Sequence, residues 1–192
     1  MAAKVSDPHD LLVHKLSVLL TTEREIERML PTLEKEAHDD ELKQGFRRHL
    51  DETRAHVRNV EQAFSVLGAQ PQGTPAPAVK GLEQQYKSFA SAAADDVQPD
   101  VLDAVSADAA AATEHHEIAA YEGAITLARG LGLSGVAEVL GQNLEQEQAM
   151  LQGVKSVSER LSKQEQREAQ AIDADEIDAM SAVPPPGMPP MS

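Results

Sequence analysis

The stretch from Glu114 to Tyr121, Glu-His-His-Glu-Ile-Ala-Ala-Tyr, holds the residues whose types and spacing are best suited to chemistry. Glu114 and Glu117 are three residues apart, so a helix would place both carboxylates on one face, with Tyr121 one turn further along. The surrounding segment is rich in alanine, and we expect it to be deeply buried. Two like charges in an apolar interior are costly unless a partner compensates them. The stretch therefore predicts either a solvated helix face or a bound cation.

The composition restricts the class of protein that could carry such a site. The chain has 192 residues, enough for one domain with a core. Aromatic residues make up 3%, and no run alternates in the manner of a strand, so helix is expected throughout. The chain has no cysteine, which excludes disulfides, thiolate metal sites and cysteine catalysis.

Charge and hydropathy also exclude some partners. The formal net charge is −15 and no basic stripe is present, which argues against nucleic acid as a partner. No apolar run has the length of a membrane span, and the N-terminal residues do not resemble a signal peptide. We therefore expect a soluble, cytoplasmic protein with no membrane partner.

Four long amphipathic helices are predicted to position the polar residues. They begin at Pro8, near residue 40, near residue 100 and at Ser134, and each carries an apolar stripe at helical spacing. A shorter helix, from about residue 79 to 94, lies in the long connection between the second and third. Two tight hairpins joined by a long crossover are typical of a ferritin-like four-helix bundle, so the fold class predicted is all-α.

The domain is predicted to comprise residues 1–166. Residues 167–192 are acidic and then rich in proline, and we expect them to form a disordered C-terminal tail.

The polar residues on the four stripes are predicted to meet at one depth. Measured from the turns near residues 39 and 132, each lies about 20 to 27 Å along its helix, at 1.5 Å per residue. Stray surface glutamates would not be expected to share a level. The residues predicted to be metal ligands are Glu23, Glu52, His56, Glu114, Glu117 and Glu147.

Five carboxylates and one imidazole suit two divalent ions about 3.5 to 4 Å apart. Two such ions would leave a charge of −1 on the five glutamates. Oxygen-rich ligation favours iron or manganese (two Fe or Mn ions), because zinc usually recruits more histidine or cysteine.

Simpler interpretations exist for several of these residues. A lone glutamate on an apolar stripe, such as Glu23 or Glu147, can specify helix register or reach solvent at a kink. Glu52 has the weakest assignment to the inward face, because Asp51 is adjacent to it. We expect His115 to support a ligand through a hydrogen bond.

His49 and Tyr121 are the other side chains assigned to the candidate site, and His116 is not. His49 is predicted to be a satisfied histidine of the core or rim, and His116 to be exposed. Tyr121 is predicted to have a structural role, by a hydrogen bond to a ligand carboxylate, in preference to a role as a one-electron relay.

Four stretches resemble the YciE/YciF group of ferritin-like proteins: Glu23 to Pro31, His49 to His56, Glu114 to Tyr121, and Leu144 to Ala149. The resemblance extends over about residues 10–163, and the Glu-His-x-Glu-Ile-Ala-Ala-Tyr stretch is its most specific part. It implies a ferritin-like bundle, a homodimer, a two-metal carboxylate site and a link to bacterial stress responses.

The chain departs from the family pattern at three positions and from rubrerythrin-like sites at a fourth. His116 and Glu122 stand where tyrosine and glycine are usual, and Gln146 replaces the first of two adjacent acids. Met150 stands where rubrerythrin-like sites have a histidine. The site predicted for this chain is therefore asymmetric and poor in histidine.

The leading hypothesis is a non-haem di-iron or di-manganese protein that oxidises Fe(II) or removes peroxide, with O2 or peroxide as oxidant. The alternative is a metal-poor helical scaffold or stress-interaction protein without turnover. Storage of mineral in a large cage is the least favoured reading, because the short crossover helix and acidic tail give no sign of cage symmetry.

Overall fold

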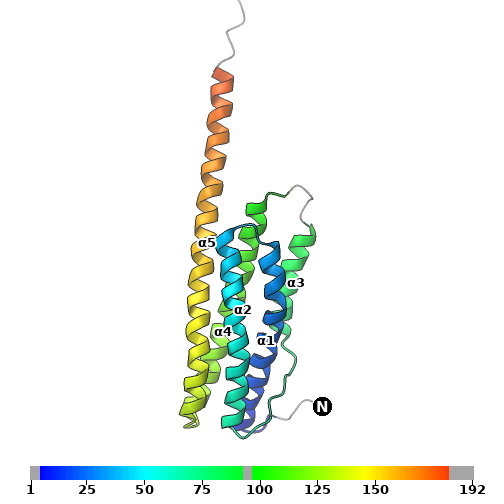
Figure 1. The fold of residues 1–192 in the computed structure, drawn as a ribbon, viewed down its shortest axis with the longest axis vertical. Helices are drawn as coiled ribbons and strands as arrows, with labels where there is room; N and C mark the ends of the chain where they lie inside the picture. Colours follow the sequence, from blue (N-terminus) through cyan, green and yellow to red (C-terminus); the bar gives the residue numbers. More distant parts are fainter. Residues whose placement is uncertain (1–4, 93–96, 182–192) are drawn as a thin grey trace, which may run out of the picture.

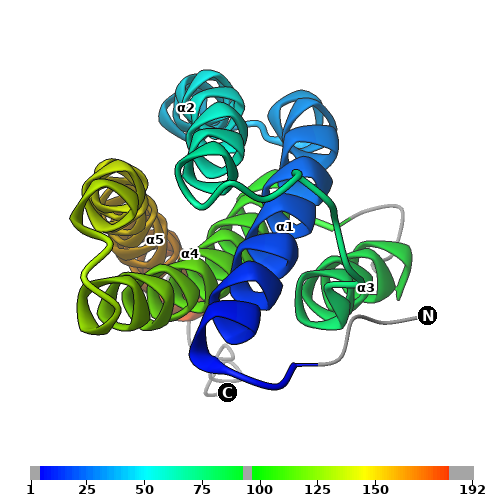
Figure 2. The same ribbon diagram turned by 90° about the horizontal axis from the view of Figure 1, so that it is seen from below.

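The computed structural model describes residues 5–92 and 97–181, with side chains up to residue 163. These residues form five helices and no strand. The long helices α1, α2, α4 and α5 form the bundle, and α3 covers one side of it, against α1 and α4 (Figures 1 and 2). The predicted all-α, ferritin-like bundle with a short helix in its crossover is confirmed. The bounds are α1 Pro8–Glu36, α2 Asp40–Val66, α3 Pro77–Ala92, α4 Pro99–Gly130 and α5 Ser134–Ser181.

Local signals in the sequence explain where the helices begin and end. Asp7 caps α1 by accepting a hydrogen bond from the Asp10 N–H at 2.8 Å, and Pro8 follows where no N–H is needed. Asp39 caps α2 in the same way, accepting from the Leu42 N–H at 2.9 Å. Gly132 has a φ of +74° in the turn between α4 and α5, a conformation that favours glycine.

A buried aspartate joins the two hairpins. Asp103, in the first turns of α4, accepts hydrogen bonds from the backbone N–H groups of His38 at 2.8 Å and Asp39 at 2.6 Å. Its carboxylate thereby satisfies the backbone of the α1–α2 turn, which would otherwise be left unpaired next to the core. The contact fixes the depth of α4 relative to α1 and α2.

Two apolar clusters fill the bundle, one on each side of its midpoint. The first includes Leu16, Leu20, Val60, Phe64 and Leu140. The second includes Ile26, Leu30, Phe46, Leu151 and Val154. Along α1, Glu23 lies between the two sets, and the other buried carboxylates and imidazoles occupy the corresponding level of α2, α4 and α5.

Helix α5 extends further than the sequence analysis predicted. The backbone is helical to Ser181, past the domain boundary expected at residue 166, and the helix projects beyond the rest of the bundle (Figure 1). The stretch after residue 163 is rich in glutamine, glutamate, arginine and alanine. Residues of high helix propensity can extend an existing helix without a new nucleation step. Residues 182–192 of the predicted tail lie outside the described residues.

None of the helices in the described part of the chain has the length and apolar character required to cross a membrane.

Candidate metal centre

Six buried side chains meet at the midpoint of the bundle. They form two groups whose potential ligand atoms lie within 4.8 Å of one another. We call Glu23, His56 and Glu147 the first group, and His49, Glu114, Glu117 and Glu147 the second group. Glu147 belongs to both groups, so its carboxylate could contribute a ligand to either of them.

Every long helix contributes to the cluster. Helix α1 supplies Glu23, α5 supplies Glu147, and α4 supplies Glu114 and Glu117 three residues apart. Helix α2 supplies His49 and His56, which are seven residues apart and therefore lie on one face, two turns from each other.

In the first group, His56 lies between two carboxylates. Its Nδ1 is 2.9 Å from Glu147 Oε1 and 3.4 Å from Glu23 Oε2. Its Nε2 is 2.8 Å from the side-chain oxygen of Gln146. With this acceptor against it, Nε2 carries a proton, so Nδ1 is the nitrogen that faces the carboxylates and would bind a metal after losing its own proton.

Hydrogen bonds from uncharged side chains hold Glu23 in place. The Tyr121 hydroxyl donates to Glu23 Oε1. The side-chain amide of Asn143 donates to the Tyr121 oxygen at 2.9 Å and to the backbone carbonyl of His56 at 3.3 Å. Asn59 donates in turn to the Asn143 side-chain oxygen at 2.7 Å. Side chains from α2, α4 and α5 thus hold the first group in position.

The second group has looser geometry. His49 Nε2 lies 3.3 Å from Glu114 Oε1 and 3.7 Å from Glu147 Oε2. Its Nδ1 lies 3.5 Å from Glu52 Oε2, on the outer side of the cluster. Neither oxygen of Glu117 has a hydrogen-bond partner among the described residues.

Lack of hydrogen-bond partners sets the six residues apart. In the described part of the chain, ten buried side-chain nitrogen and oxygen atoms have no hydrogen-bond partner. Nine of these ten belong to the six residues of the two groups, and the tenth is Thr22 Oγ1. Buried polar atoms normally find a partner, so their concentration at one point fits a bound cation.

In the metal-free cluster, three of the buried glutamates have raised pKa values. Burial raises the pKa of Glu114 and Glu117, and the nearby Glu147 carboxylate raises both further. Burial also raises the pKa of Glu23, and hydrogen bonding to His56 only partly offsets it. In the absence of a cation, these three groups therefore tend to hold their protons.

Glu147 and His56 form an ion pair within the same cluster. Burial is the largest influence on Glu147 and opposes its ionisation, but the contacts with His56, His49 and Glu114 together outweigh burial and lower the pKa of that carboxyl. Burial likewise opposes protonation of His56, but Glu147 and Glu23 raise its pKa to about 10. A metal ion would take the place of these protons.

The structure brings together five of the six predicted ligands: Glu23, His56, Glu114, Glu117 and Glu147. Glu52 belongs to neither group, and its side chain is 36% exposed. His49, predicted to be a core or rim histidine, is buried inside the second group. His49 lies two full turns before His56 on α2 and therefore shares the inward face of the helix with it. Glu52 lies to one side of this inward face.

The remaining predicted residues have mixed placements. Tyr121 contacts a candidate ligand directly, as the hydrogen-bond reading predicted. His115 is exposed and His116 half-buried, and neither belongs to either group. Gln146 and Asn143 contact the cluster but were not among the predicted residues. Asn143 precedes Glu147 by four residues, so its place on the same helix face was the signal available.

A bundle of four long helices with carboxylates and imidazoles buried at its midpoint defines a ferritin-like protein with a cluster that could hold metal. Residues 7–167 match the family described as Domain of unknown function (DUF892), and the chain belongs to this family. It is similar to Protein YciF of Escherichia coli (strain K12), with 30% identity over 141 residues, which cover 73% of this chain and 83% of YciF. The resemblance seen in the sequence is confirmed.

Solved structures show the same likeness. The structure of YcfI from Rhodopseudomonas palustris is 33% identical, with a TM-score of 0.76, and the match covers 81% of this chain and 97% of that one. The structure of the E. coli stress protein YciF is 26% identical, with a TM-score of 0.77, and the match covers 83% of this chain and 99% of that one.

Proposed function

We propose that this protein holds two iron or manganese ions at the buried cluster and uses them in a redox reaction, either the oxidation of Fe(II) or the removal of peroxide, during stress. The observation that carries the proposal is the convergence, from four helices on one point, of nine buried polar atoms that have no hydrogen-bond partner in the described part of the chain. The similarity to a protein described as a stress protein supports the physiological setting.

The donor set fits two divalent ions. Glu23 and His56 would hold one ion, His49, Glu114 and Glu117 the other, and Glu147 would bridge them. Four carboxylates and two neutral imidazoles balance two 2+ charges, so the buried cluster would be electrically neutral. This set has no thiolate and is rich in oxygen, which favours iron or manganese over zinc. When bound, such metals supply one-electron redox chemistry toward O2 or peroxide.

The chain's own residues would orient and protect this chemistry. Tyr121 fixes one oxygen of Glu23 and leaves the other directed at His56. Gln146 holds the proton of His56 on Nε2, so that Nδ1 faces the site. The apolar clusters on both sides exclude bulk water, which strengthens every charge interaction between them.

Elemental analysis tests the proposal. After anaerobic loading with Fe(II) or Mn(II) and removal of excess metal, we expect about two ions per chain, as in other carboxylate-bridged pairs. The matched control is Glu52→Gln, which changes a carboxylate outside both groups and should leave the content unchanged. A content near zero in the loaded wild-type protein would contradict the proposal.

A scaffold without turnover is the second candidate function. The observation that favours it is the ion pair of His56 and Glu147, which gives the metal-free cluster a low-energy arrangement. A scaffold should keep its melting temperature in the presence of a strong chelator. A metalloprotein should lose several degrees, because a ligand that binds only the folded state stabilises it.

We also propose that the chain forms a homodimer, as the family resemblance implies. Light scattering at dimer mass would support this assembly and would argue against a storage cage, whereas a mass of many subunits would overturn it.

A further inference from the structure

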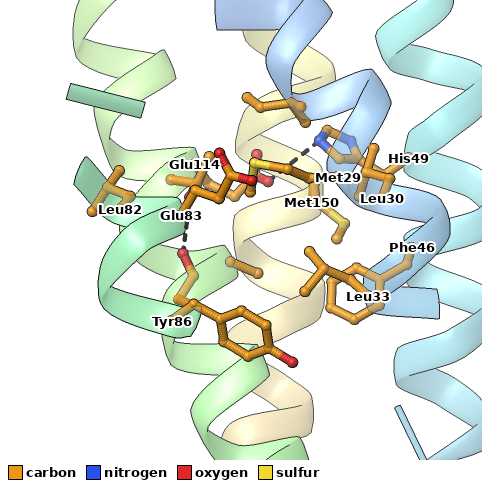
Figure 3. Close-up of a pocket in the computed structure, with 14 residues that line it drawn as sticks. Met29, Leu30, Leu33, Phe46, His49, Leu82, Glu83, Tyr86, Glu114 and Met150 are labelled. Carbon is orange, nitrogen blue, oxygen red and sulfur yellow. Dashed lines mark hydrogen bonds and ion pairs between the residues drawn. The ribbon is translucent and has the colours of Figure 1, made fainter. Parts of the chain in front are cut away.

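A narrow cavity leads from beneath α3 to the second group of the cluster. Figure 3 shows His49 and Glu114 at one end of it, with Met29 and Met150 beside them, and Tyr86 further away. The cavity holds about 30 Å³, room for one or two molecules of the size of water. Of the six cluster residues, only His49 and Glu114 line it, and both belong to the second group alone. The cavity therefore approaches one half of the cluster and not the other.

The walls of the cavity are apolar along most of their length. They include Ile26, Leu30, Phe46, Leu82, Ala110 and Met150, drawn from all five helices. The polar side chains at the inner end are His49 and Glu114, and both are buried. Neither nitrogen of His49 has a hydrogen-bond partner in the described part of the chain, and the same holds for Glu114 Oε2.

Helix α3 contributes Leu82, Glu83 and Tyr86 to the wall of the cavity. Two surface hollows lie on either side of this helix, and both share Tyr86 with the cavity. Tyr86 is held in position because its hydroxyl donates to Glu36 Oε2 at 2.9 Å and accepts from the Ser106 hydroxyl at 3.3 Å. The tyrosine ring thus forms a fixed wall between the surface hollows and the buried end.

The size and lining select for a small apolar molecule. Hydrogen peroxide or a hydrated cation would have to give up hydrogen bonds to water along a wall that offers few in return. A small apolar gas loses none, and apolar protein cavities take up such molecules readily. We propose that this cavity binds dioxygen and delivers it to the His49–Glu114–Glu117 half of the cluster. The inference rests on the proposed metal function and assigns its oxidant as O2 instead of peroxide.

The first test uses xenon as an apolar probe of the metal-free protein. In 129Xe NMR we expect a saturable shift that disappears in Ala110→Leu, because the added carbons fill the cavity. Ala119→Leu is the matched control, since Ala119 is exposed on the same helix. If Ala110→Leu does not fold, Leu82→Trp closes the cavity from α3. A xenon shift that is absent in the wild-type protein, or equal in the filled and control variants, would overturn the proposal.

The second test uses the Fe(II)-loaded protein. Stopped-flow mixing with O2 should show oxidation about tenfold slower in Ala110→Leu than in Ala119→Leu, a factor that corresponds to about 1.4 kcal/mol in the barrier. The rate with added hydrogen peroxide should change much less.

The outcomes separate the two proposals. An unchanged O2 rate in a filled variant that still binds two ions overturns the dioxygen route and leaves the proposed metal function intact. Equal slowing of the O2 and peroxide reactions overturns the selectivity for dioxygen. A wild-type protein that binds no metal overturns both proposals.

Discussion

The two halves of the buried cluster differ in how firmly their side chains are held. In the first group, Tyr121 donates to Glu23 and Gln146 accepts from His56, so both residues have fixed orientations. In the second group, neither oxygen of Glu117 accepts a hydrogen bond from any described residue, and His49 lies more than 3 Å from each neighbouring carboxylate.

This difference predicts that the two halves of the cluster have different roles. A preorganised set of ligands binds an ion tightly, because little order must be created on binding. A looser set can rearrange when a small molecule arrives, and it is the looser half that the apolar cavity reaches. We therefore expect the first group to hold the more tightly bound ion and the second to be the reactive side.

The largest effect should come from Glu147, the residue common to both groups. Glu147→Ala should reduce the metal content from about two ions per chain to near zero, whereas Glu114→Ala should leave about one ion. Circular dichroism should show helicity largely intact in both. Elemental analysis after anaerobic loading measures the difference. If Glu147→Ala retained both ions, the bridging position assigned to this residue would be wrong.

Loss of the Tyr121 hydroxyl should weaken metal binding at the first group only. Tyr121→Phe removes the hydrogen bond to Glu23, and removal of such a supporting contact typically costs about 10- to 100-fold in metal affinity. Competition with a chelator should show weaker binding of the tighter ion and little change for the other. Tyr86→Phe is the matched control, because its hydroxyl contacts Glu36 and Ser106 and not the cluster. Equal losses in the two variants would contradict the distinction.

In the metal-free protein, the carboxyls of Glu114 and Glu117 and the imidazole of His56 should affect stability in different pH windows. Glu114 and Glu117 have raised pKa values, so they favour the folded state at pH below about 4.5 and this contribution is lost as pH rises toward their folded values. The raised pKa of His56 stabilises the folded state fully below its unfolded value of about 6.5, and this stabilisation is lost as pH rises through about 10.

Denaturant unfolding of chelator-treated protein between pH 4 and 10.5 measures both windows. Glu114→Gln should reduce the change in unfolding free energy at acid pH and leave the change at alkaline pH as it is. His56→Gln should reduce the alkaline change and leave the acid change as it is. A single window that both variants alter equally would show that the halves titrate as one unit.

Much of the fold and part of the cluster could be predicted from the sequence because the signals were local. One charged residue on an apolar stripe identified Glu23 and Glu147, and spacing by three identified Glu114 and Glu117. On α2, the seven-residue spacing placed His49 on the same face as His56 and left Glu52 at the flank, so the signal for His49 was present in the sequence. The bonds of Asn143 and Gln146 depend on side-chain rotamers and on the approach of α5 to α2.

The cavity and the contacts of Asp103 could not be predicted from a pattern in the sequence. The cavity exists because α3 covers residues of α1 and α4 without filling the space beneath it, and no periodic signal reports that misfit. Asp103 pairs with backbone groups more than sixty residues away, so its partners carry no side-chain signature. Long-range contacts of this kind require the assembled bundle.

The smallest effect we predict concerns Gln146, which is exposed and whose side-chain oxygen lies 2.8 Å from the far nitrogen of His56. Gln146→Glu would place a carboxylate against Nε2–H, and a charged acceptor makes the imidazole a stronger donor to metal through Nδ1. We expect the tighter ion to bind a few-fold more strongly, with the second group unchanged. Gln148→Glu adds the same charge at another exposed position of α5 and controls for general attraction of cations. Because both variants change the net charge equally, a gain confined to Gln146→Glu would show that the hydrogen bond to His56, and not the surface field, distinguishes the first half of the cluster from the second.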